Sequence, residues 1–195
     1  SHNFLGHLDA WIQSRTNSLT TMKSVFLTLR KLKNVKMFLP APDFDESLVT
    51  TLARNNPDLT GLRFMNYPSL SEESLDLLAS SCPGLQELNI SFRDGASEIN
   101  KLSSSFPNLK HLCVRCFGSD DEQLMKFGEK FRRLERLVLI DNVTSAITDS
   151  GVERIVGAAK NLKYLGIDWA PKVTKDIVER LRMEYPDLDL RIGFY

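Results

Sequence analysis

The chain has 195 residues, of which 42% are hydrophobic and 26% are charged. This composition is typical of a folded globular protein and excludes disordered, collagen-like and purely coiled-coil classes. Lys and Arg together number 25, as do Asp and Glu, so the formal net charge is zero, which argues against nucleic acid or an anionic membrane as a partner.

Location is suggested by what the sequence lacks. No apolar run approaches the roughly 20 residues that span a bilayer. The first residues, Ser1–Phe4, have neither the basic nor the apolar region of a secretory signal. Three cysteines are too few for a disulfide framework, which fits a reducing compartment. We therefore expect a cytoplasmic or nuclear protein and, because the chain starts at Ser1 without Met, a part of a longer one.

One pattern recurs along the whole chain: a leucine, two variable residues, a second leucine, one variable residue and an apolar residue. Its copies, looser in the first two, begin near residues 5, 32, 59, 85, 109, 134 and 162. The steps of 24 to 28 residues between them fall within the range of leucine-rich repeats. An apolar segment near residue 188 departs from the pattern and is predicted to be a terminal strand.

In chain order, each copy of the pattern is predicted to be a strand, and the segment after it a helix. Residues 1–31 are interpreted as an early repeat. Helices are expected to open at capping boxes, Asp43–Glu46 and Ser119–Glu122, and over Ser71–Leu78, where apolar residues recur at helical spacing. Proline cannot continue a helix and biases the residue before it toward extended backbone, so X-Pro pairs are expected to end the helices. These pairs are Asn56-Pro57, Cys82-Pro83, Phe106-Pro107 and Tyr185-Pro186.

The repeats predict the fold class. One strand and one helix cannot bury an apolar face alone, so the units must stack. We predict an α/β leucine-rich repeat solenoid, or horseshoe, of about seven repeats, with parallel strands on the concave side and helices on the convex side. No shift in composition marks a linker, so a single domain over residues 1–195 is expected.

The fullest repeat reads Leu134-x-x-Leu137-x-Leu139-x-x-Asn142, followed by Ile147-Thr148-Asp149-Ser150-Gly151-Val152. It resembles the cysteine-containing class of leucine-rich repeat, whose helix ends in Cys-Pro, as at Cys82-Pro83. Repeats of this class are most familiar as the substrate-recognition part of F-box proteins, the adaptors of Skp-cullin ubiquitin ligases. The resemblance implies a non-catalytic domain that binds a protein substrate or peptide, with a Skp-type adaptor as partner if an F-box lies outside this chain. A leucine-rich repeat scaffold or regulator without ligase function, including a GTPase-regulator type, is the alternative.

The sequence contains no phosphate-binding loop, nucleophile elbow or dinucleotide fingerprint, so neither an enzyme nor a cofactor is expected. An enzyme hypothesis would rest on a dyad of His111 and Cys113, for which a histidine lining a binding surface is the simpler interpretation. Cys113 and Cys116 have the spacing of half a zinc site without a second half, so packing is expected there and no metal is predicted.

Alternation along each strand sends the leucines inward and the residues between them to the concave face. Cations and acids nearly balance there, beside apolar and aromatic residues that folding does not require. Aromatic residues and arginine dominate protein–protein hot spots, so this face suits a peptide or protein, with its cations selecting acidic or phosphorylated segments. The predicted partner-binding residues are Lys36, Phe38, Arg63, Met65, His111, Arg115, Arg136, Ile140, Tyr164, Asp168 and Trp169.

Overall fold

A computed structural model of the chain describes residues 9–13, 27–38, 45–64, 69–91, 96–116, 119–141 and 145–193, with backbone only at 9–13, 38, 96–97, 116 and 141. The chain divides into two compact units, Ser1–Asn89 (unit 1) and Ile90–Tyr195 (unit 2). The single domain expected over residues 1–195 stays a prediction, and each unit is described by itself.

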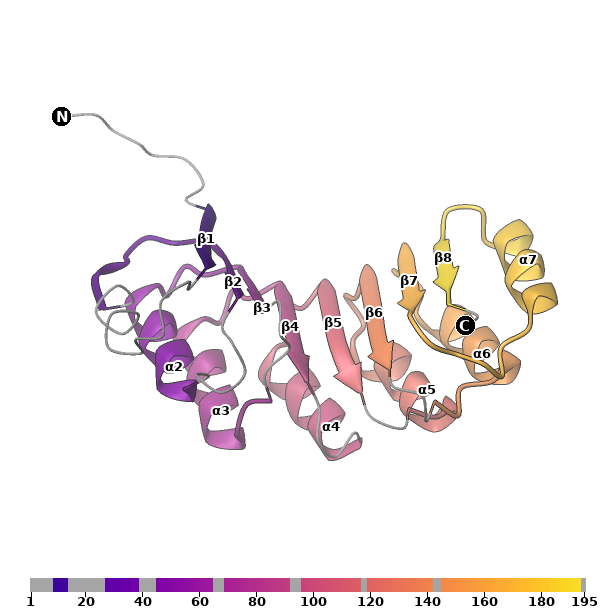
Figure 1. Cartoon of the computed structure of the whole chain (residues 1–195), viewed down its shortest axis with the longest axis horizontal. Coiled ribbons are helices and arrows are strands. Elements are labelled where there is room, and N and C mark those ends of the chain that lie inside the picture. The colour runs from indigo at the N-terminus through magenta and orange to yellow at the C-terminus, as the bar shows by residue number, and fades with distance from the viewer. Residues whose placement is uncertain are drawn as a thin grey trace. The chain divides into compact units, whose positions relative to one another are not determined.

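Unit 1 alternates parallel strands with helices. Its elements are β1 (Asp9–Gln13), β2 (Asn34–Phe38), α2 (Glu46–Asn55), β3 (Gly61–Phe64), α3 (Glu72–Ser81) and the first half of β4 (Glu87–Ser91). Each strand pairs in parallel with the next, and the register aligns Val35 with Leu62 and Leu62 with Leu88. The strands are labelled in Figure 1. The three side chains are buried, so the second apolar residues of successive repeats form one row of the core.

Unit 2 repeats the alternation. Its elements after β4 are α4 (Ala96–Ser105), β5 (His111–Cys116), α5 (Asp121–Lys130), β6 (Arg136–Asp141), α6 (Asp149–Ala158), β7 (Tyr164–Ile167), α7 (Lys175–Glu184) and β8 (Asp189–Ile192). Strands β5 to β8 pair in sequence order and are all parallel, while α5 and α6 lie together on one side of β5 and β6 (Figure 1). Leu112, Leu137, Leu165 and Leu190 share one register row and are buried.

Helices α2, α3, α5 and α7 start at side-chain caps, whereas Thr148 before α6 makes no side-chain cap hydrogen bond, and the predicted capping boxes are shifted. The carboxylate of Asp120, not the hydroxyl of Ser119, caps α5, accepting the Gln123 N–H at 2.8 Å. Ser119 is only 2% exposed, so its side chain faces the core while Asp120 lies where a carboxylate can remain solvated. Helix α2 is capped by Asp45, and Asp43 lies outside the described residues.

The Ile-Thr-Asp-Ser-Gly-Val segment joins neighbouring helices. The N–H and hydroxyl of Thr148 donate to the carboxylate of Asp121 at 2.7 and 2.6 Å. A Cβ on Gly151 would lie 2.1 Å from the same carboxylate, so glycine is required for this close approach. Asp149 accepts the equivalent pair of hydrogen bonds from Thr174 at 2.6 and 2.8 Å. The motif's Thr and Asp therefore connect its helix to the helices before and after it.

The helices end where the X-Pro pairs predict. Helices α2, α3, α4 and α7 stop directly before Asn56, Cys82, Phe106 and Tyr185. The carbonyl of each of these residues accepts the N–H of the leucine three positions on, at 3.0 to 3.2 Å, which turns the chain into the next strand. Within each unit, stacked strand–helix repeats thus form the leucine-rich repeat solenoid that the sequence predicts. No helix among the described residues is long and apolar enough to cross a membrane.

Candidate functional site

In each unit, the residues that alternate with the buried strand leucines form one surface, here called the strand face. In unit 1 it consists of Asn34, Lys36, Gly61, Arg63, Glu87 and Asn89. In unit 2 it consists of His111, Cys113, Arg115, Arg136, Val138, Ile140, Tyr164, Gly166, Asp168, Asp189 and Arg191. Apart from the two glycines, these side chains are half-buried or exposed, whereas the residues between them are buried, as the alternation predicts.

On the strand face of unit 1, Arg63 is paired with Glu87 of the neighbouring strand. The Nε of Arg63 donates to Oε1 of Glu87 and its Nη2 donates to Oε2, so the two side chains meet fork to fork. Side-chain exposure is 47% for Arg63 and 18% for Glu87. Lys36 is aligned with Arg63 in the register and is half-buried. The charge of Arg63 is therefore matched by a carboxylate of its own unit.

Two predicted residues of unit 1 provide no side-chain geometry. Phe38 lies in β2, but its side chain is outside the described part of the chain. Met65 is outside the described residues altogether.

On the strand face of unit 2, the ring of Tyr164 lies between two guanidinium groups. The central carbon (Cζ) of Arg136 is 3.5 Å from the ring centroid, and that of Arg191 is 5.8 Å away. A Cβ on Gly166 would lie 2.9 Å from the Tyr164 ring, so the ring lies flat along its own strand over the glycine. Arg191 also binds Asp189, with Nε 3.1 Å from Oδ1.

Other predicted residues surround this cluster. The register pairs His111 with Arg136 and Arg115 with Ile140. His111 and Ile140 are half-buried and Arg115 is exposed. The structure therefore brings these four residues onto one face, together with Tyr164.

The two residues that follow β7 differ in their surroundings. Asp168 is exposed. Trp169 is half-buried, and among the described residues its buried indole N–H has no hydrogen-bond partner.

The cysteines lie in two environments. Cys113 is half-buried on the strand face, two residues from His111. Cys82 is buried at the end of α3, where its Sγ is 3.6 and 3.5 Å from the carbonyl oxygens of Ala53 and Asn56. Burial raises the pKa of the Cys82 thiol to about 11, so it is not a nucleophile near neutral pH. Within the described ranges, no three His, Cys, Asp or Glu side chains could together hold a metal ion.

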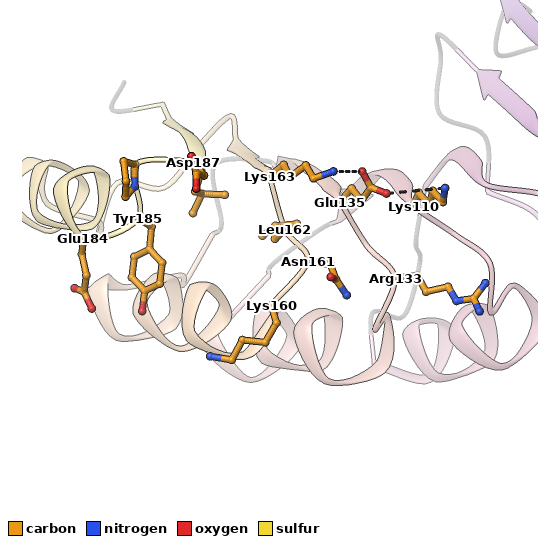
Figure 2. A pocket seen from close by; sticks show the side chains of 12 residues that line it. Lys110, Arg133, Glu135, Lys160, Asn161, Leu162, Lys163, Glu184, Tyr185 and Asp187 are labelled. Atoms are coloured by element: carbon orange, nitrogen blue, oxygen red, sulfur yellow. Dashed lines mark hydrogen bonds and ion pairs between the residues drawn. The ribbon is translucent and has the colours of Figure 1, made fainter.

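A groove of about 690 Å³ lies beside the turns that lead into β6, β7 and β8, and it was not anticipated from the sequence (Figure 2). In it, Glu135 lies between Lys163, whose Nζ is 2.8 Å from its carboxylate, and Lys110, whose Nζ is 4.0 Å away. The hydrogen bond and charge of Lys163 lower the pKa of Glu135. Each of these residues directly follows the first leucine of a repeat, so aligning the repeats would have revealed the charge alternation. Cations and acids both line the groove, which therefore favours neither sign of ligand.

Among solved structures, a chain in the "Crystal structure of Rad7 and Elc1 complex in yeast" is similar to this one, with a TM-score of 0.62 and 16% sequence identity. The alignment covers 91% of this chain and 54% of that chain, so this chain spans about half the length of that one. A likeness at this identity shows the fold alone. No curated protein matches the sequence.

The sequence also matches the family model described as "FBD-associated F-box protein At5g56370, LRR repeats", over residues 7–175. This match contains every strand from β1 to β7. Leucine-rich repeats present extended surfaces to other proteins, so the match supports a role in protein interaction. Because the matched residues make up most of the chain, the chain belongs to this family of leucine-rich repeats from F-box-associated proteins.

Proposed function

We propose that this chain is the substrate-recognition part of an F-box-type ubiquitin ligase adaptor of the Skp-cullin kind, and that it works by binding a protein without catalysing a reaction. Family membership supports the link to F-box-associated proteins. The observation that carries the proposal is the strand face of unit 2, where Val138, Ile140 and Tyr164 lie half-buried beside Arg115 and Arg136.

These side chains are not needed to hold the repeats together. The leucine rows beneath them already form the core, so a partly exposed mixture of apolar, aromatic and arginine side chains is best explained by what it contacts outside the chain. Tyrosine and arginine are among the residue types that contribute most at protein interfaces. The balanced charge of the chain makes a folded protein or a peptide a better ligand than nucleic acid or a membrane.

The proposal has two parts beyond the strand face. A Skp-type subunit would be bound by an F-box outside this chain, and the adaptor would work in the cytoplasm, the nucleus or both. Co-purification tests the first part, and imaging of the tagged full-length protein tests the second.

The central experiment uses the full-length gene product, tagged and expressed in its own cells. The strand face is altered by the double substitution Arg136→Glu and Ile140→Asp. The matched control is Arg154→Glu, which makes the same charge reversal at an exposed position on helix α6. Purified complexes are compared by quantitative mass spectrometry, and the Skp subunit is measured separately from all other proteins.

We expect all three proteins to retain the Skp subunit, and only the strand-face variant to lose a defined partner at least about tenfold, which corresponds to about 1.4 kcal/mol. Absence of the Skp subunit from the wild-type complex would contradict the ligase assignment and favour a scaffold or regulator. Full retention of partners by the strand-face variant would show that this face is not the binding site.

A further inference from the structure

The position of Arg136 on Tyr164 makes this arginine unlike the other strand-face cations. A guanidinium stacked on an aromatic ring keeps its N–H donors in the plane parallel to the ring, where they point outward at the edges. The Cζ of Arg136 is only 3.5 Å from the ring centroid, and at that distance an edge-on guanidinium would bring its nitrogens too close to the ring, so the group must lie flat on it. Stacking therefore fixes the direction of the N–H groups without using them.

The ring that supports Arg136 is itself held in place. Gly166 leaves the space in which the Tyr164 ring lies, and the guanidinium of Arg191 approaches the ring at 5.8 Å. Little side-chain entropy remains to be lost when a ligand binds a donor that is already positioned. Side chains of β7 therefore hold the guanidinium of Arg136, on the neighbouring strand β6, in a fixed orientation before a ligand binds.

The charges around Arg136 leave its donors available. Arg191 is occupied by Asp189, whose pKa is lowered by the hydrogen bond from that arginine, so Asp189 stays ionised and bound. Asp189 lies two strands from Arg136 in the register, and the charge of Arg136 contributes to lowering its pKa. Among the described side chains, none of the ion pairs involves Arg136.

We infer that Arg136, stacked on Tyr164, binds an oxyanion carried by the partner protein: a carboxylate of Asp or Glu, or the phosphate of a phosphorylated residue. Both groups accept two parallel hydrogen bonds from a guanidinium fork. The side chains of Val138 and Ile140 follow Arg136 along β6 and suit apolar residues next to the anion. This inference rests on the proposed function, because it assigns the kind of segment that the strand face of unit 2 takes.

The test uses NMR on the whole 195-residue chain with three capped pentapeptides, Gly-Ile-X-Ile-Gly, in which X is phosphoserine, Glu or Gln. The readout is the Nε–Hε signal of each arginine side chain. In the free protein, the ring current of Tyr164 should shift the Arg136 signal upfield. On titration, we expect the Arg136 signal to move with at least one of the two anionic peptides and not with the Gln peptide.

Substitutions distinguish the contribution of the guanidinium geometry of Arg136 from that of its positive charge. Arg136→Lys keeps the charge but loses both the fork and the stacking, and should weaken binding of the anionic peptide at least about tenfold. Tyr164→Phe keeps the ring and should stay within about twofold, whereas Tyr164→Leu removes it and should weaken binding about fivefold. Gly166→Ala should also weaken binding, because the new methyl group displaces the ring. Arg154→Lys on α6 is the matched control and should change nothing.

The outcomes are distinct. A response to phosphoserine alone identifies a phosphorylated partner, and a response to both anionic peptides identifies an acidic one as well. Failure of both anionic peptides to move the Arg136 signal, equal binding of the Gln peptide, or full binding by Arg136→Lys would overturn the inference. If any of these results accompanies partner loss in the Arg136→Glu and Ile140→Asp variant, the proposed function stands and only the oxyanion assignment fails.

Discussion

Units 1 and 2 share the same strand–helix repeat, but the residue that follows each helix differs in chemical type between them. The residue directly after each helix is Asn56 or Cys82 in unit 1, and Phe106, Phe131, Ala159 or Tyr185 in unit 2. At all six positions the carbonyl accepts the N–H of the leucine three residues on. The backbone hydrogen bond of this turn does not depend on the side chain. The side chain at this position can therefore be one that forms hydrogen bonds or one that packs against apolar neighbours.

Asn56 and Phe131 illustrate the two solutions. Asn56 is fully buried, its Nδ2 donates to the carbonyls of Leu52 and Leu29 at 2.9 and 3.3 Å, and its Oδ1 accepts the Leu32 N–H at 2.9 Å. Phe131 instead stacks with Phe127, with ring centroids 6.0 Å apart. Hydrogen bonds join Asn56 of unit 1 to Leu32 and Leu29 in the segment before β2, whereas Phe131 of unit 2 stacks on a residue of the helix that directly precedes it.

The strand faces differ in a parallel way. Arg63 of unit 1 donates both arms of its fork to Glu87, whereas Arg136 of unit 2 uses its flat face against Tyr164 and keeps its edges for another acceptor. The two arginines therefore present different groups to a ligand, a paired fork at Arg63 and a stacked guanidinium at Arg136. Composition alone ranks the two arginines equally.

The largest expected effect tests the helix-end comparison. Asn56→Leu keeps the branch at Cγ but replaces the amide with two methyl groups. The buried Leu32 N–H and the Leu52 carbonyl lose their partners, at about 1 to 3 kcal/mol each, so we expect the free energy of unfolding to fall by about 3 kcal/mol. Urea unfolding followed by circular dichroism measures this. The matched change Phe131→Leu should cost about 1.5 kcal/mol. An Asn56→Leu cost no greater than that of Phe131→Leu would remove the distinction between the units.

Thiol reactivity compares Cys82 of unit 1 with Cys113 of unit 2. With a pKa of about 11, only about one Cys82 thiol in a thousand is ionised at about pH 8, and the side chain is buried. Iodoacetamide should therefore modify half-buried Cys113 at least about tenfold faster in the native protein. Trypsin cleavage at Arg115 places Cys113 and Cys116 on different peptides, so mass spectrometry reads each site separately.

Two results would argue against this account of Cys82. One is equal modification of Cys82 and Cys113 in the native protein. The other is persistence of the difference after unfolding in urea, where burial no longer protects either thiol.

The smallest expected effect compares the two arginine contacts. A double-mutant cycle of Arg63→Ala with Glu87→Ala should give a coupling below about 1 kcal/mol that decreases at high salt, because the pair is partly exposed. The cycle of Arg136→Ala with Tyr164→Ala should give about 0.5 to 1 kcal/mol with weaker salt dependence, because dispersion and ring contact contribute. Equal salt dependence of the two couplings would show that the contacts are alike.

Much of the fold follows from sequence pattern. Leucine spacing predicted the strands, and the X-Pro pairs predicted the ends of α2, α3, α4 and α7, because both depend on local backbone preferences and on which face must be buried. The start of α5 was misplaced by one residue, since Ser119 and Asp120 are both good caps and only the packing of Ser119 decides between them.

The candidate site, like the fold, was predicted in part from the sequence. Alternation placed Arg63, Arg136 and Tyr164 on the strand face, and the sequence alone determined that much, because strand side chains must alternate once the leucines are buried. Only the tertiary structure decided that Arg63 meets Glu87 while Arg136 lies on Tyr164. Those contacts join residues more than 20 positions apart, and they depend on strand register, on rotamers and on the space left by Gly166, none of which is a property of a local stretch of sequence.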